Sequence, residues 1–267
     1  MNNPSDRTTI FDKFEEESAL AIEMRRLYSK LRQKTRSTNM KCFMVTSATI
    51  GEGKSTVSSY LALTTARHKK TKTILIDADL RKPKVHKYFG LAREPGLADC
   101  LAGERDILDC VQDTPVDALK VMTAGRPDPS PSYLFDTHRL GEVFAELKFY
   151  YDTLIVDSPP VIPVSDPVQL CQETDGVLMV VMAGVTPREL VVRARDVLAD
   201  VDANILGVIV NNHAEVLPYY YDHKYYGYHE RPEAEAAPQA GRARAPEPAG
   251  AGADRFWRGS KSRALKD

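Results

Sequence analysis

The chain has few cysteines, no long apolar run and almost no net charge. Its four cysteines are scattered over 267 residues without a C-x-x-C pair, which argues against a disulfide scaffold and a structural zinc site and predicts buried free thiols. No apolar run approaches the roughly 20 residues that span a bilayer, and no apolar targeting segment follows Met1, so we expect a cytoplasmic protein. With 36 basic and 37 acidic residues, no global basic field points to nucleic acid.

The centre of the chain alternates short apolar runs with longer amphipathic stretches. Apolar runs without period-two alternation are typical of strands buried on both faces, and so predict a parallel sheet covered by helices. The predicted strands are Cys42–Thr46, Thr73–Asp77, Ala118–Thr123, Thr153–Asp157, Val177–Ala183 and Ile205–Asn211. The predicted helices between them are Ser55–Arg67, Leu134–Tyr150 and Pro187–Asp200. This order predicts a doubly wound, mostly parallel α/β domain over residues 40–216.

Three further segments flank this predicted domain. Residues 1–39 are polar, with a helix predicted over Glu15–Lys34 whose apolar stripe is Leu20, Met24, Leu27 and Leu31. The stripe fits a helix packed on the core, and it also fits a helix that contacts another subunit. Residues 217–230 hold six of the chain's 12 tyrosines. Residues 231–267 are rich in Ala, Pro, Gly, Glu and Arg and are predicted to be a disordered tail.

A glycine-rich loop joins the first predicted strand to the next helix. It reads Thr49-Ile50-Gly51-Glu52-Gly53-Lys54-Ser55-Thr56 and matches the second half of the phosphate-loop pattern, with Ala48 in place of the first glycine. The glycines let backbone N–H groups surround phosphate oxygens, Lys54 supplies a positive charge, and the helix N-terminus adds its dipole. Ser55 is placed to ligate magnesium. We therefore predict a nucleotide site, a deviant Walker A motif, at this loop.

Two other predicted strands end in carboxylates. Asp157 closes one of them in the Walker B arrangement, which holds magnesium directly or through water. Asp77 and Asp79 stand at alternate positions, so both project to the same side at the carboxyl edge of the sheet. One of them can bind the magnesium sphere while the other takes a proton from an attacking hydroxyl. Arg81 and Lys82 follow and can balance this charge or bind phosphate.

Two amides close the last predicted strand. Asn211 and Asn212 suit recognition of adenine or ribose. Asn at the end of a strand is also a common turn residue. Both interpretations stay open at the level of the sequence.

The ordered set of motifs resembles the cytoplasmic domain of bacterial tyrosine kinases, the capsular and exopolysaccharide autokinases. The resemblance lies in residues 51–56, 74–83 and 156–160 and in the tyrosine cluster. The Gly/Pro-rich segment 124–132 and residues 163–166 also resemble the family's sequence. Together these matches extend over roughly residues 18–230.

The resemblance implies ATP-dependent tyrosine phosphorylation with Mg²⁺. It assigns Lys54 to ATP, Ser55, Asp77 and Asp157 to the metal, and Arg81 to the family's Arg-Lys pair. Asp79 is the candidate that orients or deprotonates the tyrosine hydroxyl. The expected autophosphorylation sites, modified in trans between subunits, are Tyr219, Tyr220, Tyr221, Tyr225, Tyr226 and Tyr228.

The resemblance also implies partners. The family's ring-forming helix carries Glu-x-x-Arg-x-x-Arg, which Glu23 and Arg26 match, while Ser29 replaces the second Arg. A membrane-spanning activator, a polysaccharide co-polymerase, is expected to recruit the kinase to the inner face of the cell membrane. There the kinase regulates exopolysaccharide or capsule polymerisation and export, and other tyrosine-containing proteins are further expected substrates.

Two alternatives remain beside the kinase. The first is a non-kinase P-loop ATPase of the partitioning or septum-positioning kind. Those proteins carry a signature Lys in K-G-G-x-G-K-T, and here Thr49 stands at that position. The second is an ATP-binding assembly scaffold without turnover, which would bind nucleotide but transfer no phosphate.

Overall fold

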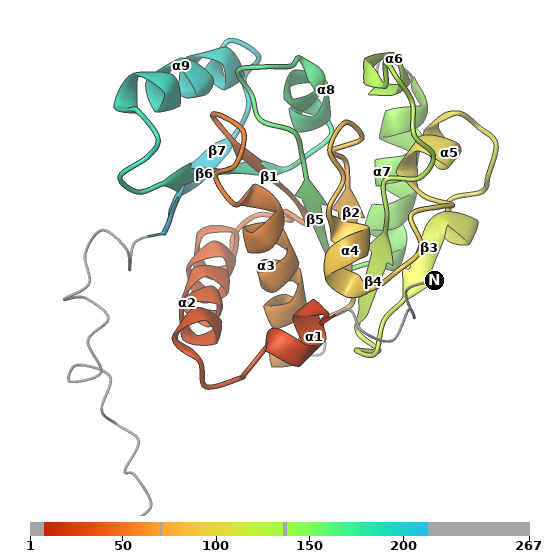
Figure 1. The fold of residues 1–267 in the computed structure, drawn as a ribbon, viewed down its shortest axis with the longest axis horizontal. Helices are drawn as coiled ribbons and strands as arrows, with labels where there is room; N and C mark the ends of the chain where they lie inside the picture. The colour runs from red at the N-terminus through yellow and green to blue at the C-terminus, as the bar shows by residue number, and fades with distance from the viewer. Residues whose placement is uncertain (1–7, 70, 136–137, 213–267) are drawn as a thin grey trace, which may run out of the picture. The chain divides into compact units, whose positions relative to one another are not determined.

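The computed structural model describes residues 8–69, 71–135 and 138–212 (Figure 1). They form a seven-stranded sheet in the order β3-β4-β2-β5-β1-β6-β7. All neighbouring strands pair in parallel except β3, which is antiparallel to β4. The strands are β1 (Cys42–Ser47), β2 (Thr73–Asp77), β3 (Val111–Asp113), β4 (Leu119–Met122), β5 (Thr153–Asp157), β6 (Gly176–Met182) and β7 (Ile205–Asn211). The predicted doubly wound fold class is therefore confirmed.

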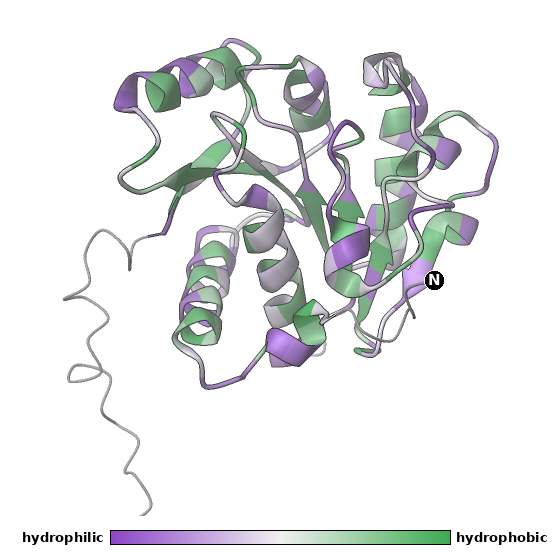
Figure 2. Ribbon diagram, in the orientation of Figure 1, coloured by the Kyte–Doolittle hydropathy of each residue, from purple (hydrophilic) through white to green (hydrophobic). Residues whose placement is uncertain are grey.

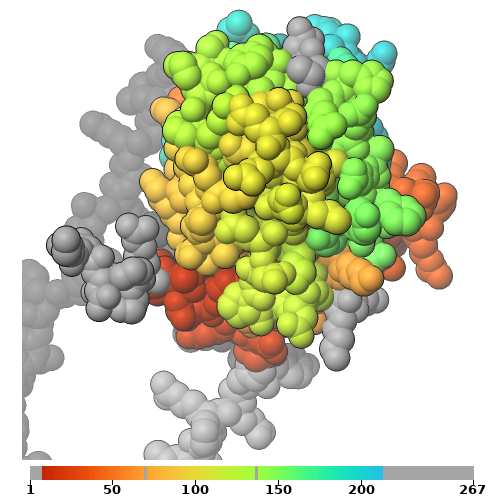
Figure 3. All heavy atoms as spheres, turned by 90° about the vertical axis from the view of Figure 1, so that its right-hand side faces the viewer, coloured from red at the N-terminus to blue at the C-terminus, as the bar shows by residue number. Residues whose placement is uncertain are grey.

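Helices cover both faces of this sheet (Figure 1). One face packs against α1 (Ile10–Lys13), α2 (Ala19–Lys34), α3 (Lys54–Lys69) and α4 (Val85–Phe89). The other packs against α5 (Leu97–Leu101), α6 (Ser132–Phe135), α7 (His138–Tyr150), α8 (Asp166–Gln172) and α9 (Arg188–Ala199), and a 3-10 turn, η2 (Leu108–Cys110), precedes β3. Segments from the middle of the chain form the side of the domain seen in Figure 3.

The uninterrupted apolar runs of the strands follow from this arrangement. In β1, Cys42 and Met44 pack into one core, while Phe43 and Val45 pack into the core on the other face. Because both faces are covered, neither set of alternate positions meets water. Figure 2 shows the result as central strands that are mostly apolar, whereas the edge strand β3 is partly polar.

The predicted N-terminal helix is present, but its stripe was partly wrong. Helix α2 begins at Ala19, after Ser18, whose hydroxyl accepts the Ala21 N–H at 3.2 Å as an N-cap. Its buried residues are Ala21, Met24, Tyr28 and Leu31, whereas Leu20 is 40% exposed. The buried face is the one that packs on α3, and Leu20 lies beside that face rather than on it.

The shortest helices and the shortest strand were not predicted from the sequence. Strand β3 and helices α1, α4, α5 and α8 have three to seven residues, too few for a periodic pattern to identify them. The helix predicted over Leu134–Tyr150 is described as two, α6 and α7. Residues 217–230 and the tail 231–267 lie outside the described residues.

The cysteines and the helix lengths bear on two of the sequence-based expectations. All four cysteines are buried free thiols, as expected. None of the helices in residues 8–69, 71–135 and 138–212 has the length and apolar character needed to cross a bilayer.

Candidate active site

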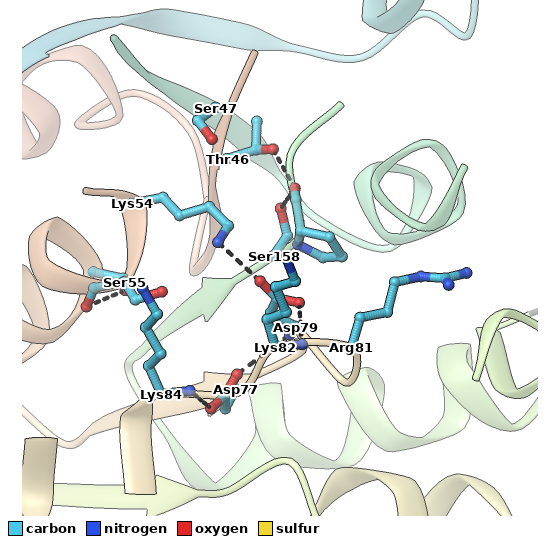
Figure 4. A network of polar contacts seen from close by, with 12 residues as sticks. Thr46, Ser47, Lys54, Ser55, Asp77, Asp79, Arg81, Lys82, Lys84 and Ser158 are labelled. Carbon is cyan, nitrogen blue, oxygen red and sulfur yellow. Dashed lines mark hydrogen bonds and ion pairs between the residues drawn. The ribbon is translucent and has the colours of Figure 1, made fainter. Parts of the chain in front are cut away.

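The phosphate loop and the acidic strand ends meet at the carboxyl edge of the sheet. Strand β5 lies between β1 and β2, and Asp157 pairs in register with Asp77 on one side and with Val45 on the other. The loop that follows β1 leads directly into α3, whose first residue is Lys54. Strand order therefore brings together three segments that are far apart in the sequence (Figure 4).

Lys54 and Asp79 form a nearly buried ion pair at this edge. The Lys54 Nζ lies 2.8 Å from the Asp79 Oδ2, and the two side chains are 12% and 5% exposed. The other carboxylate oxygen of Asp79 accepts the Lys82 N–H at 3.0 Å. Burial alone would lower the pKa of Lys54, but the negative charges of Asp157, Asp79 and Asp77 outweigh it and raise that pKa. The lysine is therefore a permanent cation facing carboxylates.

The carboxylate of Asp77 accepts hydrogen bonds from backbone N–H groups. Its Oδ2 accepts the N–H groups of Val85 at 3.0 Å and Lys84 at 3.2 Å, so the carboxylate caps the start of α4. Its Oδ1 accepts the Asp79 N–H at 3.3 Å. Burial, followed by the charge of Asp157, raises the pKa of Asp77 well above its ordinary value. Asp77 thus lies at the predicted site, and it also has a structural task there.

Asp157 differs from Asp77 because neither of its oxygens accepts a hydrogen bond of good geometry from the described residues, although the Ser55 and Ser58 hydroxyls lie near it. The side chain is fully buried. Burial raises the pKa of Asp157 to about 6, against the opposing influence of the Lys54 charge and the Ser55 and Ser58 hydroxyls. A buried carboxylate with free lone pairs is costly unless a cation approaches it.

This donor set fits magnesium. Within the described residues, no group of three or more His, Cys, Asp or Glu could hold a metal ion by itself. Mg²⁺ commonly uses one or two carboxylates, keeps several waters and takes its remaining ligands from substrate phosphates. Asp157, with Ser55 buried at the start of α3, matches that requirement.

The phosphate loop is held by its own glutamate. Glu52 is buried, and its Oε2 accepts the Thr49 N–H at 2.7 Å. Its Oε1 accepts a short hydrogen bond from the hydroxyl of Thr186, which precedes α9. Thr186 was not predicted as a partner of Glu52, because no sequence motif links two residues that are 134 positions apart. Ile50 and Thr56 are exposed on the loop and on the first turn of α3.

Asn211 anchors the same loop from β7. Its Nδ2 donates to the backbone carbonyl of Glu52 at 3.0 Å. Gly51 and Gly53 both have φ of +89°, and a Cβ added at Gly53 would come within 2.1 Å of the Asn211 Nδ2. Asn212 has a positive φ of 59°, which fits the turn interpretation of this residue.

Arg81 is directed away from the carboxylates that precede it (Figure 4). Its Nε donates to the Oδ2 of Asp166 at 2.9 Å, and its Nη2 donates to the Ser132 Oγ at 2.5 Å. Both partners lie in segments that resemble the family's sequence, 124–132 and 163–166, but neither was predicted as a site residue.

The remaining predicted residues lie elsewhere. Glu23 and Arg26 pair on the surface of α2, with Arg26 Nη1 2.6 Å from Glu23 Oε1. The six tyrosines of residues 219–228 lie outside the described residues.

A family model supports the fold and its phosphate loop. The ParA model, described as NUBPL iron-transfer P-loop NTPase, matches residues 39–241. The septum site-determining protein MinD of Pyrococcus horikoshii, solved with Mg-ADP, is 22% identical with a TM-score of 0.57, covering 66% of this chain and 71% of that one. At that identity the likeness shows the fold alone.

Closer relatives carry a more specific name. Tyrosine-protein kinase YwqD of Bacillus subtilis is 37% identical over 188 residues, which are 70% of this chain and 78% of the relative. The solved kinase domain of the Escherichia coli tyrosine kinase Etk is 32% identical with a TM-score of 0.69 and covers 72% of this chain and 75% of that one.

Proposed function

The chain belongs to the bacterial tyrosine kinases of the P-loop NTPase fold, and we propose that it transfers the γ-phosphoryl group of Mg-ATP to tyrosine hydroxyls. The observation that carries this proposal is the contact between Lys54 and Asp79 at 2.8 Å. Lys54 as the proposed phosphate-binding cation and Asp79 as the proposed proton acceptor then lie side by side at the edge of the sheet that carries the phosphate loop.

Lys54 and the loop bind the nucleotide in this proposal. The backbone N–H groups of residues 49–56 surround the phosphates, and Lys54 faces the β and γ phosphates. Phosphate oxygens then compete with Asp79 for the ammonium group, and Asp79 is released from the ion pair. Asn211 contributes by holding the loop through Glu52, and base recognition by Asn211 or Asn212 is part of the same proposal.

Asp79 receives the proton of the tyrosine hydroxyl. The tyrosine oxygen bonds to the γ phosphorus as the bond to the β-phosphate oxygen breaks and ADP leaves. Ser55 and Asp157 would hold Mg²⁺, with Asp77 beside them. The bound ion would neutralise charge on the phosphates.

The tyrosine cluster is the proposed first substrate, and other tyrosine-containing proteins are further ones. Phosphorylation in trans requires a homo-oligomer, for which Glu23 and Arg26 on α2 are the proposed contacts. A membrane-spanning activator would bring the kinase from the cytoplasm to the membrane, where it would regulate exopolysaccharide or capsule production. The names of the relatives support the tyrosine-kinase activity. The motif resemblance supports the proposed partners and the role in polysaccharide production.

The proposal is tested by incubating the full chain with Mg-ATP, with and without a candidate activator segment, and mapping phosphate by mass spectrometry. We expect phosphate on tyrosines 219–228 in the wild type and none in Lys54→Ala. Labelling should be unchanged in the control Lys120→Ala, which removes a partly exposed lysine of β4 that pairs with Asp113 of β3. Deleting residues 217–230 should abolish self-labelling but spare transfer to an added tyrosine peptide.

Other outcomes of the same experiment would replace the kinase. ADP release with unmodified tyrosines would favour the ATPase alternative. The matching family model is itself described as a P-loop NTPase. Bound ATP with neither ADP nor phosphotyrosine, even with the activator segment, would favour the scaffold.

A further inference from the structure

Beside the turn that carries Asp79, a buried carboxylate pairs with a partly exposed guanidinium group. Asp166, the first residue of α8, is fully buried, and Arg81 is its ion-pair partner at 2.9 Å. Ser132, the first residue of α6, joins them: its Oγ donates to the Asp166 Oδ1 at 2.5 Å and accepts from the Arg81 Nη2 at 2.5 Å. Segments that follow β2, β4 and β5 therefore converge on one guanidinium group.

This cluster is connected to Asp79 through a single turn. The Asp79 Oδ1 accepts the Lys82 N–H at 3.0 Å, so the carboxylate closes the four-residue turn 79–82 on itself. Arg81 lies inside that turn. The ion pair between Arg81 and Asp166 of α8 holds one side of this turn. Lys54 contacts the Asp79 carboxylate through its other oxygen.

The energetics keep Arg81 at this anchor. Asp166 is fully buried, and among the described residues Arg81 is the one cation that pairs with it, so losing Arg81 would leave a buried charge uncompensated. Moving the guanidinium to a bound phosphate would leave Asp166 in that condition. The pair is therefore better suited to holding the turn than to binding substrate.

We propose that Asp166 and Ser132 are positioning residues for phosphoryl transfer, which act through Arg81 to hold the Asp79 carboxylate at the reacting hydroxyl. This inference rests on the proposed function, since it concerns the proton acceptor of that reaction. It assigns a task to residues 132 and 166, and it makes Arg81 a positioning residue as well.

The test compares Asp166→Asn, Ser132→Ala and Arg81→Ala in the full chain, with Asp196→Asn as the matched control. Asp196 forms an exposed ion pair with Arg195 at 2.6 Å on α9, so the same chemical change is made away from the turn. Steady-state kinetics with a tyrosine peptide give kcat and both KM values, and fluorescent ATP analogue binding gives Kd. Thermal unfolding identifies variants that do not fold.

We expect Asp166→Asn to lower kcat about 10- to 100-fold, since displacement of a reacting group by about 1 Å can cost that much, with nucleotide Kd nearly unchanged. Ser132→Ala should show a smaller loss in the same direction. In the Arg81→Ala background, Asp166→Asn should cause no further loss, because both act through one group. Asp196→Asn should match the wild type.

Three results would overturn the inference while leaving the kinase assignment intact. They are an unchanged kcat in folded Asp166→Asn, additive losses in the double variant, or a nucleotide Kd that rises strongly in Arg81→Ala but not in Asp166→Asn. The last would make Arg81 a phosphate ligand. A wild type that transfers no phosphate would instead contradict the proposed function itself.

Discussion

The ammonium group of Lys54 lies 2.8 Å from the carboxylate of Asp79, although Lys54 begins α3, after β1, and Asp79 follows β2. In this contact each charge neutralises the other. Phosphate binding at Lys54 and proton acceptance at Asp79 both require this contact to open. Nucleotide binding and release of the proton acceptor are therefore one event in the proposed mechanism.

Asp79→Asn should separate binding from chemistry. The amide keeps the size of the side chain but cannot take the tyrosine proton, so we expect kcat for a tyrosine peptide to fall about 100-fold or more. ATP affinity should be unchanged or higher, because Lys54 no longer has to leave a carboxylate. Single-turnover transfer and ATP binding measure the two quantities, and equal kcat values for variant and wild type would remove Asp79 from the reaction.

Asp157→Asn should stabilise the nucleotide-free protein while abolishing phosphoryl transfer. Because burial raises the pKa of Asp157 to about 6, its protonated form favours folding. That contribution is complete below the unfolded value of about 3.9 and is lost as pH rises through 6. The variant should therefore exceed the wild type in unfolding free energy by about 2–3 kcal/mol near pH 7.5, and the gap should close toward pH 4.

Urea unfolding without nucleotide or magnesium at these two pH values checks this prediction. The control Asp196→Asn, in which the altered side chain is 55% exposed, should show no comparable pH-dependent gap. A less stable Asp157→Asn protein at neutral pH would mean that an unrecognised partner satisfies the carboxylate.

Gly51→Ala and Gly53→Ala should differ, although both glycines have φ of +89°. The backbone strain of about 1–3 kcal/mol is common to both. Only the Gly53 substitution also forces a contact with the Asn211 amide, since the space around Gly51 is open. We expect Gly53→Ala to lose more thermal stability and ATP affinity, with part of the loss recovered in the double variant with Asn211→Ala.

The single Asn211→Ala variant adds a specificity measurement. If the amide anchors the loop, affinities for ATP and GTP should fall by the same factor. A loss confined to ATP would instead support adenine recognition. Failure of the double variant to recover any stability would contradict the steric explanation for Gly53.

Glu23→Ala and Arg26→Ala should reduce self-association and phosphorylation in trans. Their mutual ion pair is exposed and contributes little to the fold of one subunit, so thermal stability should change by less than about 1 kcal/mol. Light scattering gives the assembly size, and transfer from an active chain to a Lys54→Ala chain gives the rate in trans. Unchanged assembly in both variants would locate the subunit contact elsewhere.

Six of the seven strands and the main residues of the site could be predicted from the sequence. The central strands β1, β2 and β5 are recognisable because both of their faces are covered and most of their residues are apolar. Lys54, Ser55, Asp77, Asp79 and Asp157 could be selected because a phosphate loop and strand-end carboxylates have fixed positions relative to their own strands. These are local relations, and they survive without knowledge of the neighbouring segments.

The groups that those residues contact depend on how the elements pack together in three dimensions. Asp77 and Asp157 look alike in the sequence, yet one caps α4 while the other has unused oxygens in the described structure. Arg81 meets Asp166, 85 positions away, and Glu52 meets Thr186. The order of the strands in the sheet brings such partners together. Sequence periodicity does not reveal that order, because each contact joins elements that are far apart in the chain.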